Sequence, residues 1–383
     1  MKSLPDKLQQ KLKARDAQQA LRTLPSFLHH VDFYSNDYLG FAHSDKIIEY
    51  TEDLLSVYTN KSGATGSRLI SGNHELYPIV EQKIADFHQV DTALLFNSGY
   101  NANVGFFSSV PQRGDLVFYD ELIHASIRDG MQLSLAKSYK FKHNNLSDLK
   151  EKIDRLAIPD QCIYVVIESV YSMDGDSPNL QHFAEYCDTN NYLLVIDEAH
   201  SLGVFGSEGE GLVQYLGLQE KVFAQIMTYG KALGVHGAAI LCKKDLYSYL
   251  VNYARSLIYT TAMPPHTVAS IGAGYQILST LSKTHYLKNL RRNISHFQQE
   301  LKRLELAGIF IPSYSAIHCC LISGNEKVKF VAQCLQNKGF GVKAILSPTV
   351  SKDEERLRFC LHAYNDLKQI TEVLEQLKLL LEK

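Results

Sequence analysis

The sequence predicts an α/β fold, with a mostly parallel sheet in a large domain and a smaller α+β domain after it. From about residue 90, short apolar runs alternate with helical patterns, which is typical of βαβ units around an open sheet. The C-terminal part instead has long charged helical segments around two strand-like runs. We therefore expect an N-terminal helical arm and short segment over 1–39, a large domain over 40–275 and a small domain over 276–383.

The composition excludes several classes of protein. The chain has 383 residues, of which 45% are hydrophobic and 21% charged, and 39 Lys and Arg balance 41 Asp and Glu. A nucleic-acid or membrane-surface binder normally has a basic excess, and the apolar runs are far shorter than the ~18 residues of a membrane span. The N-terminus lacks the apolar core of a secretory signal, and an odd number of cysteines, seven, indicates free thiols. We expect a soluble cytoplasmic protein with no nucleic-acid or membrane partner.

The first predicted element is an amphipathic helix over 6–24. Leu8, Leu12 and Leu21 recur at roughly helical spacing among Lys, Arg and Gln residues, and Pro25 ends the pattern. We interpret this helix as an arm packed on the main body.

Five compact apolar runs are predicted as strands of the large sheet. Runs without polar alternation are typical of strands buried on both faces, as in a parallel sheet. The runs lie at 93–96, 116–119, 163–167, 193–196 and 238–241. Helical patterns at 147–156 and 180–190 separate some of these strands.

The predicted small domain combines three helices with two strands. The helices are expected at 284–306, 326–337 and 366–382, and the strands near 317–322 and 356–361. Gly339 and Gly341 follow the second helix, where a left-handed C-cap is expected. The triplet His318-Cys319-Cys320 lies in the first strand. Because no second Cys/His pair has zinc-ligand spacing, we predict buried strand cysteines and no metal site.

Asp197 and His200 follow the apolar run 193–196. Ligand sites in open α/β sheets lie at the carboxyl ends of the strands. A buried acid there is costly without a partner, and a protonated heteroaromatic nitrogen would be one. A strand-end acid that caps a helix explains the same pattern. The tetrapeptide Asp-Glu-Ala-His also occurs in helicases, but that function needs a phosphate loop, which this chain lacks.

Lys231 lies in a glycine-flanked turn, Thr228 to Gly234. Glycine lets a backbone approach a ligand closely, and a lysine amine becomes a nucleophile when burial or a nearby cation lowers its pKa. Taken alone, the residue is more typical of a solvated loop lysine. The small polar residues 97–103 follow another strand and can present backbone N–H groups to an anion, or form a plain helix N-cap.

Two further polar residues follow predicted strands: His124 after 116–119, and Glu168 after 163–167. An acid for a ring nitrogen, a histidine near it, a lysine for an imine and an anion site for a phosphate have one common explanation. Together they describe a site for pyridoxal 5'-phosphate (PLP), whose ring accepts electrons from a substrate carbanion.

The sequence also resembles a known family, the α-oxoamine synthases, over nearly the whole chain. The resemblance rests on ordered motifs at 35–40 (SNDYLG), 66–72 (GSRLISG), 98–100 (SGY), 124–126 (HAS), 172–176 (SMDGD), 197–200 (DEAH), 228–231 (TYGK), 259–265 (YTTAMPP) and 348–350 (PTV). It implies a fold-type I PLP-transferase fold of the aspartate aminotransferase kind, and a homodimer with shared active sites.

The resemblance also implies roles for individual residues. Lys231 would form the imine with PLP and move the α-proton, Asp197 would pair with the ring nitrogen, and His124 would stack on the ring. His200, with Ser172 nearby, would bond the phenolic oxygen. The phosphate would be held by Thr228 and the backbone of Gly99 and Tyr100, and by Thr260 and Thr261 of the second subunit. The substrates would be bound by Asn36, Thr349, Arg358 and Arg22, with His124 also at the substrate.

The implied reaction is the decarboxylative condensation of an amino acid, L-alanine, with pimeloyl-CoA or a pimeloyl-carrier protein. Family members that use glycine or serine with another acyl-CoA, an aminotransferase, and a vitamin-B6-binding scaffold without chemistry are the alternatives. The sequence departs from the family pattern in three places. Leu346 stands where an arginine is common, Ser201 where glycine is common, and the stretch between Arg22 and Phe33 is short.

Overall fold

The computed structural model describes residues 3–22, 24, 30–59, 61–280 and 284–382. It divides into two compact units, a larger one of residues 36–172 and 177–289 and a smaller one of residues 1–35, 173–176 and 290–383. The smaller unit thus joins the N-terminal segment to the C-terminal part of the chain. The boundaries expected at 39 and 275 stay a prediction.

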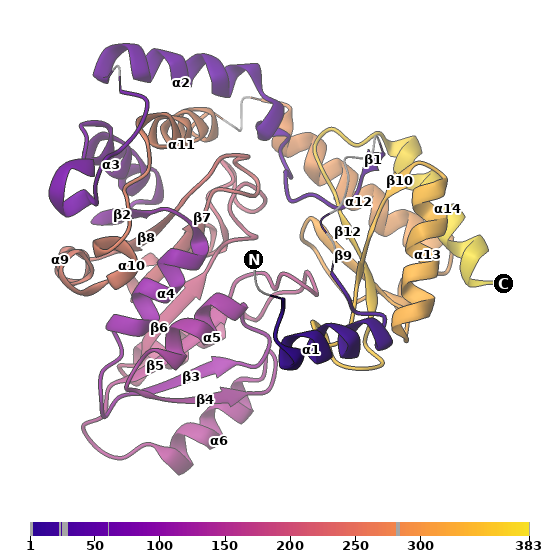
Figure 1. Cartoon of the computed structure of the whole chain (residues 1–383), viewed down its shortest axis with the longest axis horizontal. Coiled ribbons are helices and arrows are strands. Elements are labelled where there is room, and N and C mark those ends of the chain that lie inside the picture. The colour runs from indigo at the N-terminus through magenta and orange to yellow at the C-terminus, as the bar shows by residue number, and fades with distance from the viewer. Residues whose placement is uncertain (1–2, 23, 25–29, 60, 281–283, 383) are drawn as a thin grey trace. The chain divides into compact units, whose positions relative to one another are not determined.

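A seven-stranded sheet forms the centre of the larger unit (Figure 1), in the order β2-β8-β7-β6-β5-β3-β4. The strands are β2 (Thr92–Phe96), β3 (Leu116–Asp120), β4 (Lys137–Phe141), β5 (Ile163–Glu168), β6 (Leu193–Asp197), β7 (Ala224–Thr228) and β8 (Ala238–Cys242). β8 runs antiparallel to both of its neighbours, and the other pairs are parallel. The five predicted strands are therefore confirmed, and the mostly parallel fold-type I sheet with them.

Helices cover both faces of this sheet. Strand residues alternate between two cores, so that Val117 packs in one and Phe118 in the other. The first core is shared with α4 (Gly99–Ser109), α5 (Ala125–Gln132), α9 (Lys244–Tyr253) and α10 (Arg255–Ile258), and the second with α6 (Leu146–Leu156), α7 (Leu180–Thr189) and α8 (Leu212–Tyr215). The five predicted strands are buried on both faces, as their apolar composition predicts.

The sequence analysis did not anticipate three further helices of the larger unit. They are α2 (Asp45–Tyr58), α3 (Leu76–His88) and α11 (Pro265–Leu278). α11 is buried along most of its length and packs on α2 and α3. Short helical turns occupy Phe41–His43, Arg68–Gly72 and Gln219–Lys221.

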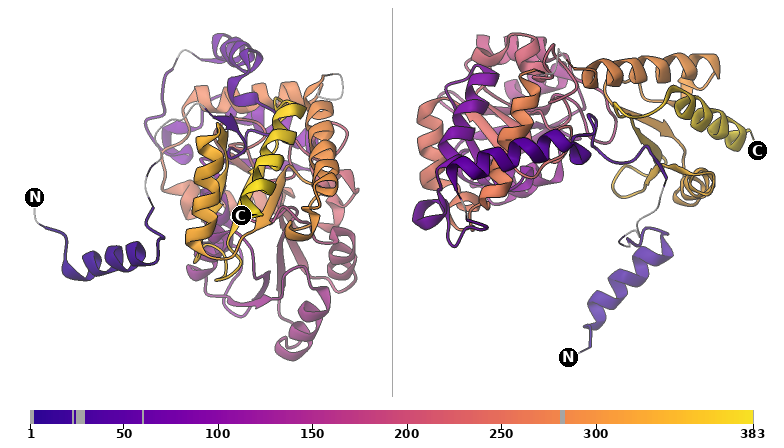
Figure 2. Two further views of the ribbon diagram at one scale, coloured as in Figure 1. Left: turned by 90° about the vertical axis from the view of Figure 1, so that its right-hand side faces the viewer. Right: turned by 90° about the horizontal axis from the view of Figure 1, so that it is seen from above.

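The smaller unit is built on a three-stranded antiparallel sheet with the order β11-β12-β9. Its elements are β9 (Ile317–Leu321), β11 (Lys343–Ile345), β12 (Arg356–Cys360), α12 (Tyr286–Arg303), α13 (Asn325–Asn337), α14 (Leu367–Leu381) and a helical turn at Ala307–Ile309. The helices gather on one face of the sheet (Figure 2). A second, parallel pair joins β1 (Val31–Asp32) to β10 (Phe340–Gly341). The predicted helices and strands of this part are confirmed.

The two glycines after α13 have different roles. Gly339 has a φ of 90°, so the predicted left-handed C-cap is confirmed there. Gly341 lies in β10 instead, and the expectation of a cap at this position is wrong. A Cβ at Gly341 would come within 2.6 Å of the Tyr34 ring, which explains why a glycine is needed in this strand.

The N-terminal helix is shorter than expected. α1 spans Asp6–Ala17, and Gln19, with a φ of 54°, interrupts the helix predicted to continue to 24. Pro25 lies outside the described residues. α1 has no buried residue, and its packing on the main body stays a prediction.

All seven cysteines are free thiols. Cys319 and Cys320 are buried in β9, as predicted for strand cysteines. None of the helices in the described part of the chain is long and apolar enough to cross a membrane.

Candidate active site

A pocket of about 230 Å³ opens at the carboxyl ends of the parallel strands in the larger unit. Asp197 ends β6, Glu168 ends β5 and Thr228 ends β7. The pocket is lined by Asn36, Ser98, Gly99, Tyr100, Asn103, His124, Ser126, Glu168, Ser172, Asp197, Ala199, His200, Thr228, Gly230, Lys231, His236 and Gly237. Nine residues assigned to the PLP ring, its phosphate or the substrate by resemblance are therefore brought together in one place.

Asp197 lies on the pocket wall with only 4% of its surface exposed. Its Oδ1 accepts a hydrogen bond from the backbone N–H of Ala199 at 3.0 Å, and its Oδ2 accepts one from Asn103 Nδ2 at 3.0 Å. Hydrogen bonds from N–H donors stabilise the charged form of a carboxyl group. The site thus holds a buried, oriented negative charge.

His124 is the N-cap residue of α5. The Ser126 backbone N–H donates to His124 Nδ1 at 3.2 Å, and Ser126 Oγ lies 2.7 Å from the same nitrogen. Burial lowers the pKa of His124, and the Lys231 charge adds to this, while Asp197 acts in the opposite direction. A neutral ring that accepts at Nδ1 carries its proton on Nε2.

His200 is fixed by a pair of polar contacts on its pocket side. Tyr38, which is fully buried, donates its O–H to Asn36 Oδ1 at 3.2 Å, and its oxygen lies 2.7 Å from His200 Nδ1. This short contact orients the imidazole.

Lys231 and Thr228 lie in the loop between β7 and β8. Lys231 Nζ donates to Thr228 Oγ1 at 3.0 Å. The turn is closed by the Gly234 N–H, which donates to the Lys231 carbonyl at 2.8 Å. Gly234 has a φ of 62°, and a Cβ there would come within 2.1 Å of the Ala42 backbone nitrogen, so the loop depends on glycine at this position.

The N-terminus of α4 enters the pocket beside Thr228. Ser98 caps the helix by accepting from the Asn101 N–H at 3.2 Å. The N–H groups of Gly99 and Tyr100 precede the first helical hydrogen bond and have no acceptor within the helix. A Cβ at Gly99 would lie 2.5 Å from Thr228 Cγ2. Only glycine lets the helix end and Thr228 form one cradle, which suits an anion.

Five residues predicted at the site do not line this pocket. Thr260 and Thr261 are in the larger unit but do not line its pocket. Arg22, Thr349 and Arg358 belong to the smaller unit. Within that unit Arg22 Nη2 donates to Thr349 Oγ1 at 3.2 Å, and Arg358 is buried in β12 with Nη1 donating to Cys360 Sγ at 2.8 Å.

Comparison with known proteins gives the family. The aminotransferase class I and II family model matches residues 29–377. An 8-amino-7-oxononanoate synthase from Emericella nidulans is 40% identical over 405 residues, covering 100% of this chain and 97% of that protein. The chain belongs to the α-oxoamine synthase family. It is therefore a PLP-dependent acyltransferase, and PLP is its cofactor.

Serine palmitoyltransferases are also similar to this α-oxoamine synthase. The enzyme from Sphingobacterium spiritivorum is 34% identical, with 90% of this chain and 85% of that protein covered. A solved structure of serine palmitoyltransferase from S. paucimobilis with bound PLP has a TM-score of 0.88 and 25% identity, and covers 98% of this chain and 96% of that one. The family is thus established more firmly than the substrate.

The pocket of this α-oxoamine synthase fits PLP. The cradle of Gly99, Tyr100 and Thr228 would hold the phosphate, and the buried Asp197 carboxylate would face the ring nitrogen. Lys231 would supply the primary amine that bonds to the aldehyde carbon. The donor set and the close approach that a Cβ at Gly99 would block match an anionic, heteroaromatic aldehyde.

Sequence reasoning did not assign four residues that shape the site. Asn103 and Ser126 connect Asp197 to His124, with Asn103 Nδ2 also donating to Ser126 Oγ at 3.0 Å. Tyr38 holds His200, and Glu168 accepts from the His124 backbone N–H at 2.6 Å. Each of the four lies within a motif or at a strand end, so a search of these places for buried polar side chains could have found them.

Proposed function

We propose that this α-oxoamine synthase condenses L-alanine with pimeloyl-CoA or a pimeloyl-carrier protein. The products would be 8-amino-7-oxononanoate, CO2 and free CoA or carrier, as a step of biotin biosynthesis. The pocket that joins Lys231, Asp197, His124 and His200 supports the chemistry. The 40% identity to an 8-amino-7-oxononanoate synthase over both whole chains is the observation that carries the choice of substrates.

PLP, when bound, supplies an electron sink for the carbanion formed at the α-carbon of the amino acid. Lys231 Nζ removes the α-proton and later returns one, with Thr228 Oγ1 as its resting partner. The charge on Asp197 keeps a ring nitrogen protonated. His124 would stack on the ring with Nε2–H available as a donor, and His200, held by Tyr38, would bond the phenolic oxygen together with Ser172.

The substrate side of the proposal rests on Asn36 in the pocket and on Arg22, Thr349 and Arg358 in the smaller unit. Arg358 is the proposed partner of the amino-acid carboxylate, because a guanidinium binds carboxylates through two parallel N–H donors. Leu346, which stands where relatives often have arginine, cannot donate a hydrogen bond. Carboxylate binding would therefore depend more on Arg358 and Asn36.

The second candidate function is a serine-using synthase of the sphingoid-base type. It is supported by the 34% identical serine palmitoyltransferase and by the TM-score of 0.88. A glycine-using acyltransferase and an aminotransferase fit the same pocket with less support. These alternatives differ in the amino acid consumed, in the acyl chain, and in whether CO2 is released.

One experiment separates these candidates. Purified PLP-loaded enzyme is incubated with alanine, glycine or serine, each with acyl-CoA thioesters of several lengths and with pimeloyl-carrier protein. We expect CO2 release and the mass of 8-amino-7-oxononanoate from alanine with a pimeloyl thioester. A long-chain product from serine would replace the proposal with the second candidate. Amino transfer to a keto acid without CO2 would place the enzyme among the aminotransferases.

Replacing Tyr38 with phenylalanine should impair His200 specifically. The substitution removes the hydroxyl group that bonds the buried His200 Nδ1, and the loss of such a hydrogen bond costs about 1–3 kcal/mol. We expect kcat/KM to fall roughly ten- to a hundred-fold, with an altered pH profile. Tyr164→Phe, at a buried tyrosine outside the pocket, is the matched control. Equal effects of both substitutions would show that Tyr38 only stabilises the fold.

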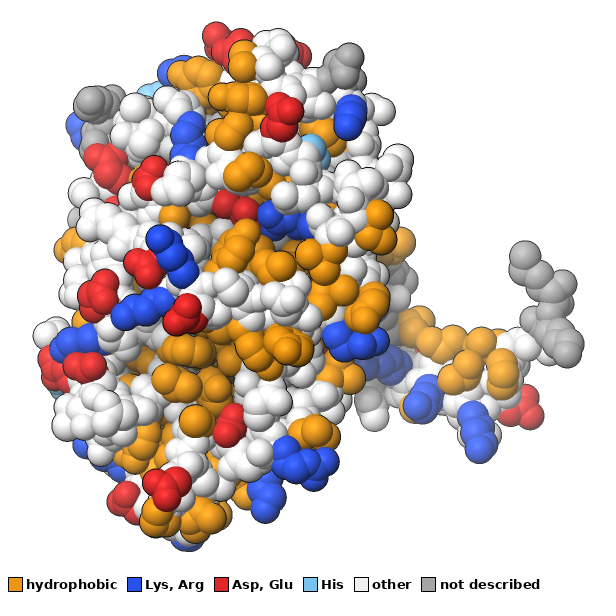
Figure 3. Space-filling view, turned by 90° about the vertical axis from the view of Figure 1, so that its left-hand side faces the viewer, with side chains coloured by type: hydrophobic (Ala, Val, Ile, Leu, Met, Phe, Trp, Pro, Cys, Tyr) orange, Lys and Arg blue, Asp and Glu red, His pale blue; other side chains and the backbone are white. Residues whose placement is uncertain are grey.

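We also propose a homodimer in which Thr260 and Thr261 complete the partner's phosphate site. Both residues lie outside the pocket of their own chain. Tyr259, next to Thr260 in the sequence, has 73% of its surface exposed. Ile70, in the family motif at 66–72, has 84% of its surface exposed. Hydrophobic side chains gather in a band over one face of the larger unit (Figure 3), and large exposed apolar patches are typical of interfaces.

Mixed subunits provide the test of this homodimer. Chains with Lys231→Ala and chains with Thr260→Ala and Thr261→Ala are each expected to have little activity. After the two are unfolded and refolded together, hybrid dimers contain one intact site, so activity should partly return. Refolding each variant alone is the control. A monomer that sediments alone at working concentration and is fully active would contradict the proposal.

A further inference from the structure

Two buried carboxyl groups lie side by side in the pocket. Glu168 ends β5 and Asp197 ends β6, and the two residues are direct register partners in the parallel pair. Glu168 is 3% exposed and Asp197 is 4% exposed, and both line the pocket. Two neighbouring buried carboxylates repel each other and lose solvation. One of the two groups is therefore expected to keep a proton at neutral pH.

The hydrogen bonds decide which of the two keeps it. Asp197 accepts from two N–H donors, Asn103 Nδ2 and the Ala199 backbone. Glu168 accepts from one, the His124 backbone N–H at 2.6 Å. Since each N–H donor favours the charged form, the negative charge is better placed on Asp197, and the proton on Glu168.

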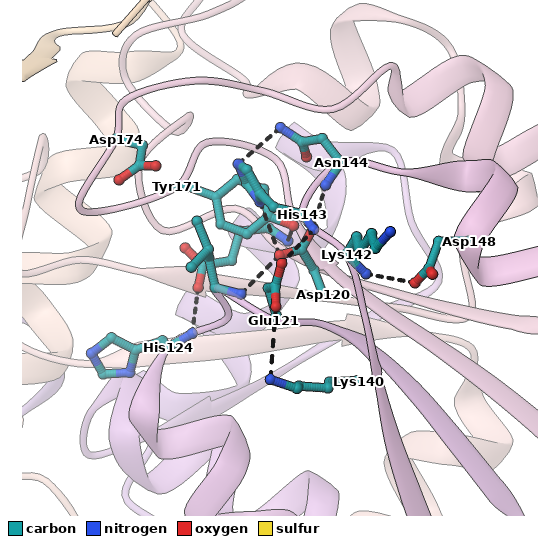
Figure 4. A network of polar contacts seen from close by, with 12 residues as sticks. Asp120, Glu121, His124, Lys140, Lys142, His143, Asn144, Asp148, Tyr171 and Asp174 are labelled. Carbon is teal, nitrogen blue, oxygen red and sulfur yellow. Dashed lines mark hydrogen bonds and ion pairs between the residues drawn. The ribbon is translucent and has the colours of Figure 1, made fainter. Parts of the chain in front are cut away.

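The other groups around Glu168 also favour its protonated form. Asp120 at the end of β3 is fully buried and accepts from His143 Nδ1 at 2.9 Å, and from the N–H groups of Leu122 at 2.9 Å and Asn144 at 2.7 Å (Figure 4). The Tyr171 hydroxyl contacts the Glu168 backbone N–H at 3.4 Å. Glu168 thus faces the acids Asp197 and Asp120.

The charges near Glu168 do not offset the effect of burial on its pKa. Burial raises the pKa of Glu168 well above its ordinary value, and the Asp197 charge adds to this. The His124 N–H and the Lys231 charge act in the opposite direction, and Asp120 raises the pKa further.

We propose that Glu168 is a positioning residue for the reaction: a neutral carboxylic acid that anchors the His124 backbone and leaves the negative charge beside it on Asp197. This role rests on the proposed function of the pocket. Through the first contact Glu168 fixes where α5 begins and hence where the His124 ring lies. Because Glu168 holds the proton, Asp197 keeps its negative charge and can pair with a cation.

Two substitutions distinguish a neutral Glu168 side chain from one whose negative charge is needed for the reaction. Glu168→Gln keeps an oxygen for the His124 N–H and can carry no charge, so activity should stay within about three-fold of the wild type, since the contact is kept. Glu168→Leu removes the acceptor and should lower kcat about ten- to a hundred-fold. A loss with Glu168→Gln as large as with Glu168→Leu would overturn the proposal.

Infrared spectroscopy tests the protonation state without relying on turnover. At neutral pH, the full-length protein, with and without PLP, should lose a carboxylic acid C=O band in Glu168→Gln. Glu220→Gln is the control, since the Glu220 side chain is 86% exposed and outside the pocket, so this substitution should remove a carboxylate band instead. Loss of a carboxylate band in Glu168→Gln instead would refute the neutral acid.

The pH dependence of stability gives a second readout that needs no substrate. A carboxyl group whose pKa is raised in the folded state binds more protons there than in the unfolded state. The unfolding free energy of the wild type should therefore fall relative to Glu168→Gln as the pH rises above the ordinary value of 4.5. If the variant does not fold, a pH titration of the carboxylic acid band in the wild type decides the same question. These readouts would stand even if the substrates proved to be different.

Discussion

Lys231→Ala should fold and should lose nearly all turnover. The loop is shaped by its backbone, through the Gly234 N–H bond and the positive φ of Gly234, so removing the side chain should leave it in place. The substitution removes both the group that bonds covalently to PLP and the proposed base. General acid–base catalysis alone typically contributes about 10²- to 10⁴-fold, so kcat should fall by at least that factor.

The covalent bond gives this prediction a direct measurement. After treatment with borohydride, the mass of the wild-type chain should increase by that of reduced PLP, and the Lys231→Ala chain should show no such increase. Lys243→Ala is the matched control, because the Lys243 side chain is 75% exposed and outside the pocket. More than half of wild-type turnover in Lys231→Ala would show that the site is assigned wrongly.

The sheet could be predicted because burial on both faces leaves a simple apolar signal. Five strands of the sheet have this apolar signal in the sequence, but β4 and β7 do not. In β4 (KSYKF) only Phe141 is buried, since this strand lies at the edge of the sheet. β7 (AQIMT) contains Gln225 and ends in Thr228. The antiparallel direction of β8 could not be predicted either, because an apolar run carries no direction.

The chemistry-bearing residues of the pocket could be predicted, because each follows a strand or a glycine turn. The residues that hold these side chains in place could not be predicted. Tyr38 reaches His200 across 162 positions and Asn103 reaches Asp197 across 94 positions, and no local pattern reports such contacts. The family resemblance supplied residues 260 and 261, which do not line the pocket of their own chain and are proposed to serve the pocket of a partner.

Asp197→Asn should bind PLP and stabilise the carbanion poorly. Asparagine carries no charge, so it cannot hold a proton on the ring nitrogen. It also offers a single acceptor oxygen where Asp197 uses two, for Asn103 Nδ2 and for the Ala199 N–H. One of these donors would then face an NH₂ group. Loss of one partner of a buried charge pair costs about 3–5 kcal/mol, or on the order of 10²- to 10³-fold in rate.

The exchange of the alanine α-proton in deuterated buffer measures this effect before any acyl transfer, so it does not depend on the identity of the thioester. We expect Asp197→Asn to slow the exchange by that factor while thermal unfolding of the full chain changes little. Glu198→Gln replaces the adjacent buried carboxyl group, whose pKa burial raises to about 7, and keeps its Oε1 contacts, so exchange in this control should be close to the wild type. If exchange in Asp197→Asn were unchanged, another group would have to hold the ring proton. Glu168, the register partner of Asp197, would then be the first to test, and the neutral role proposed for it would be wrong.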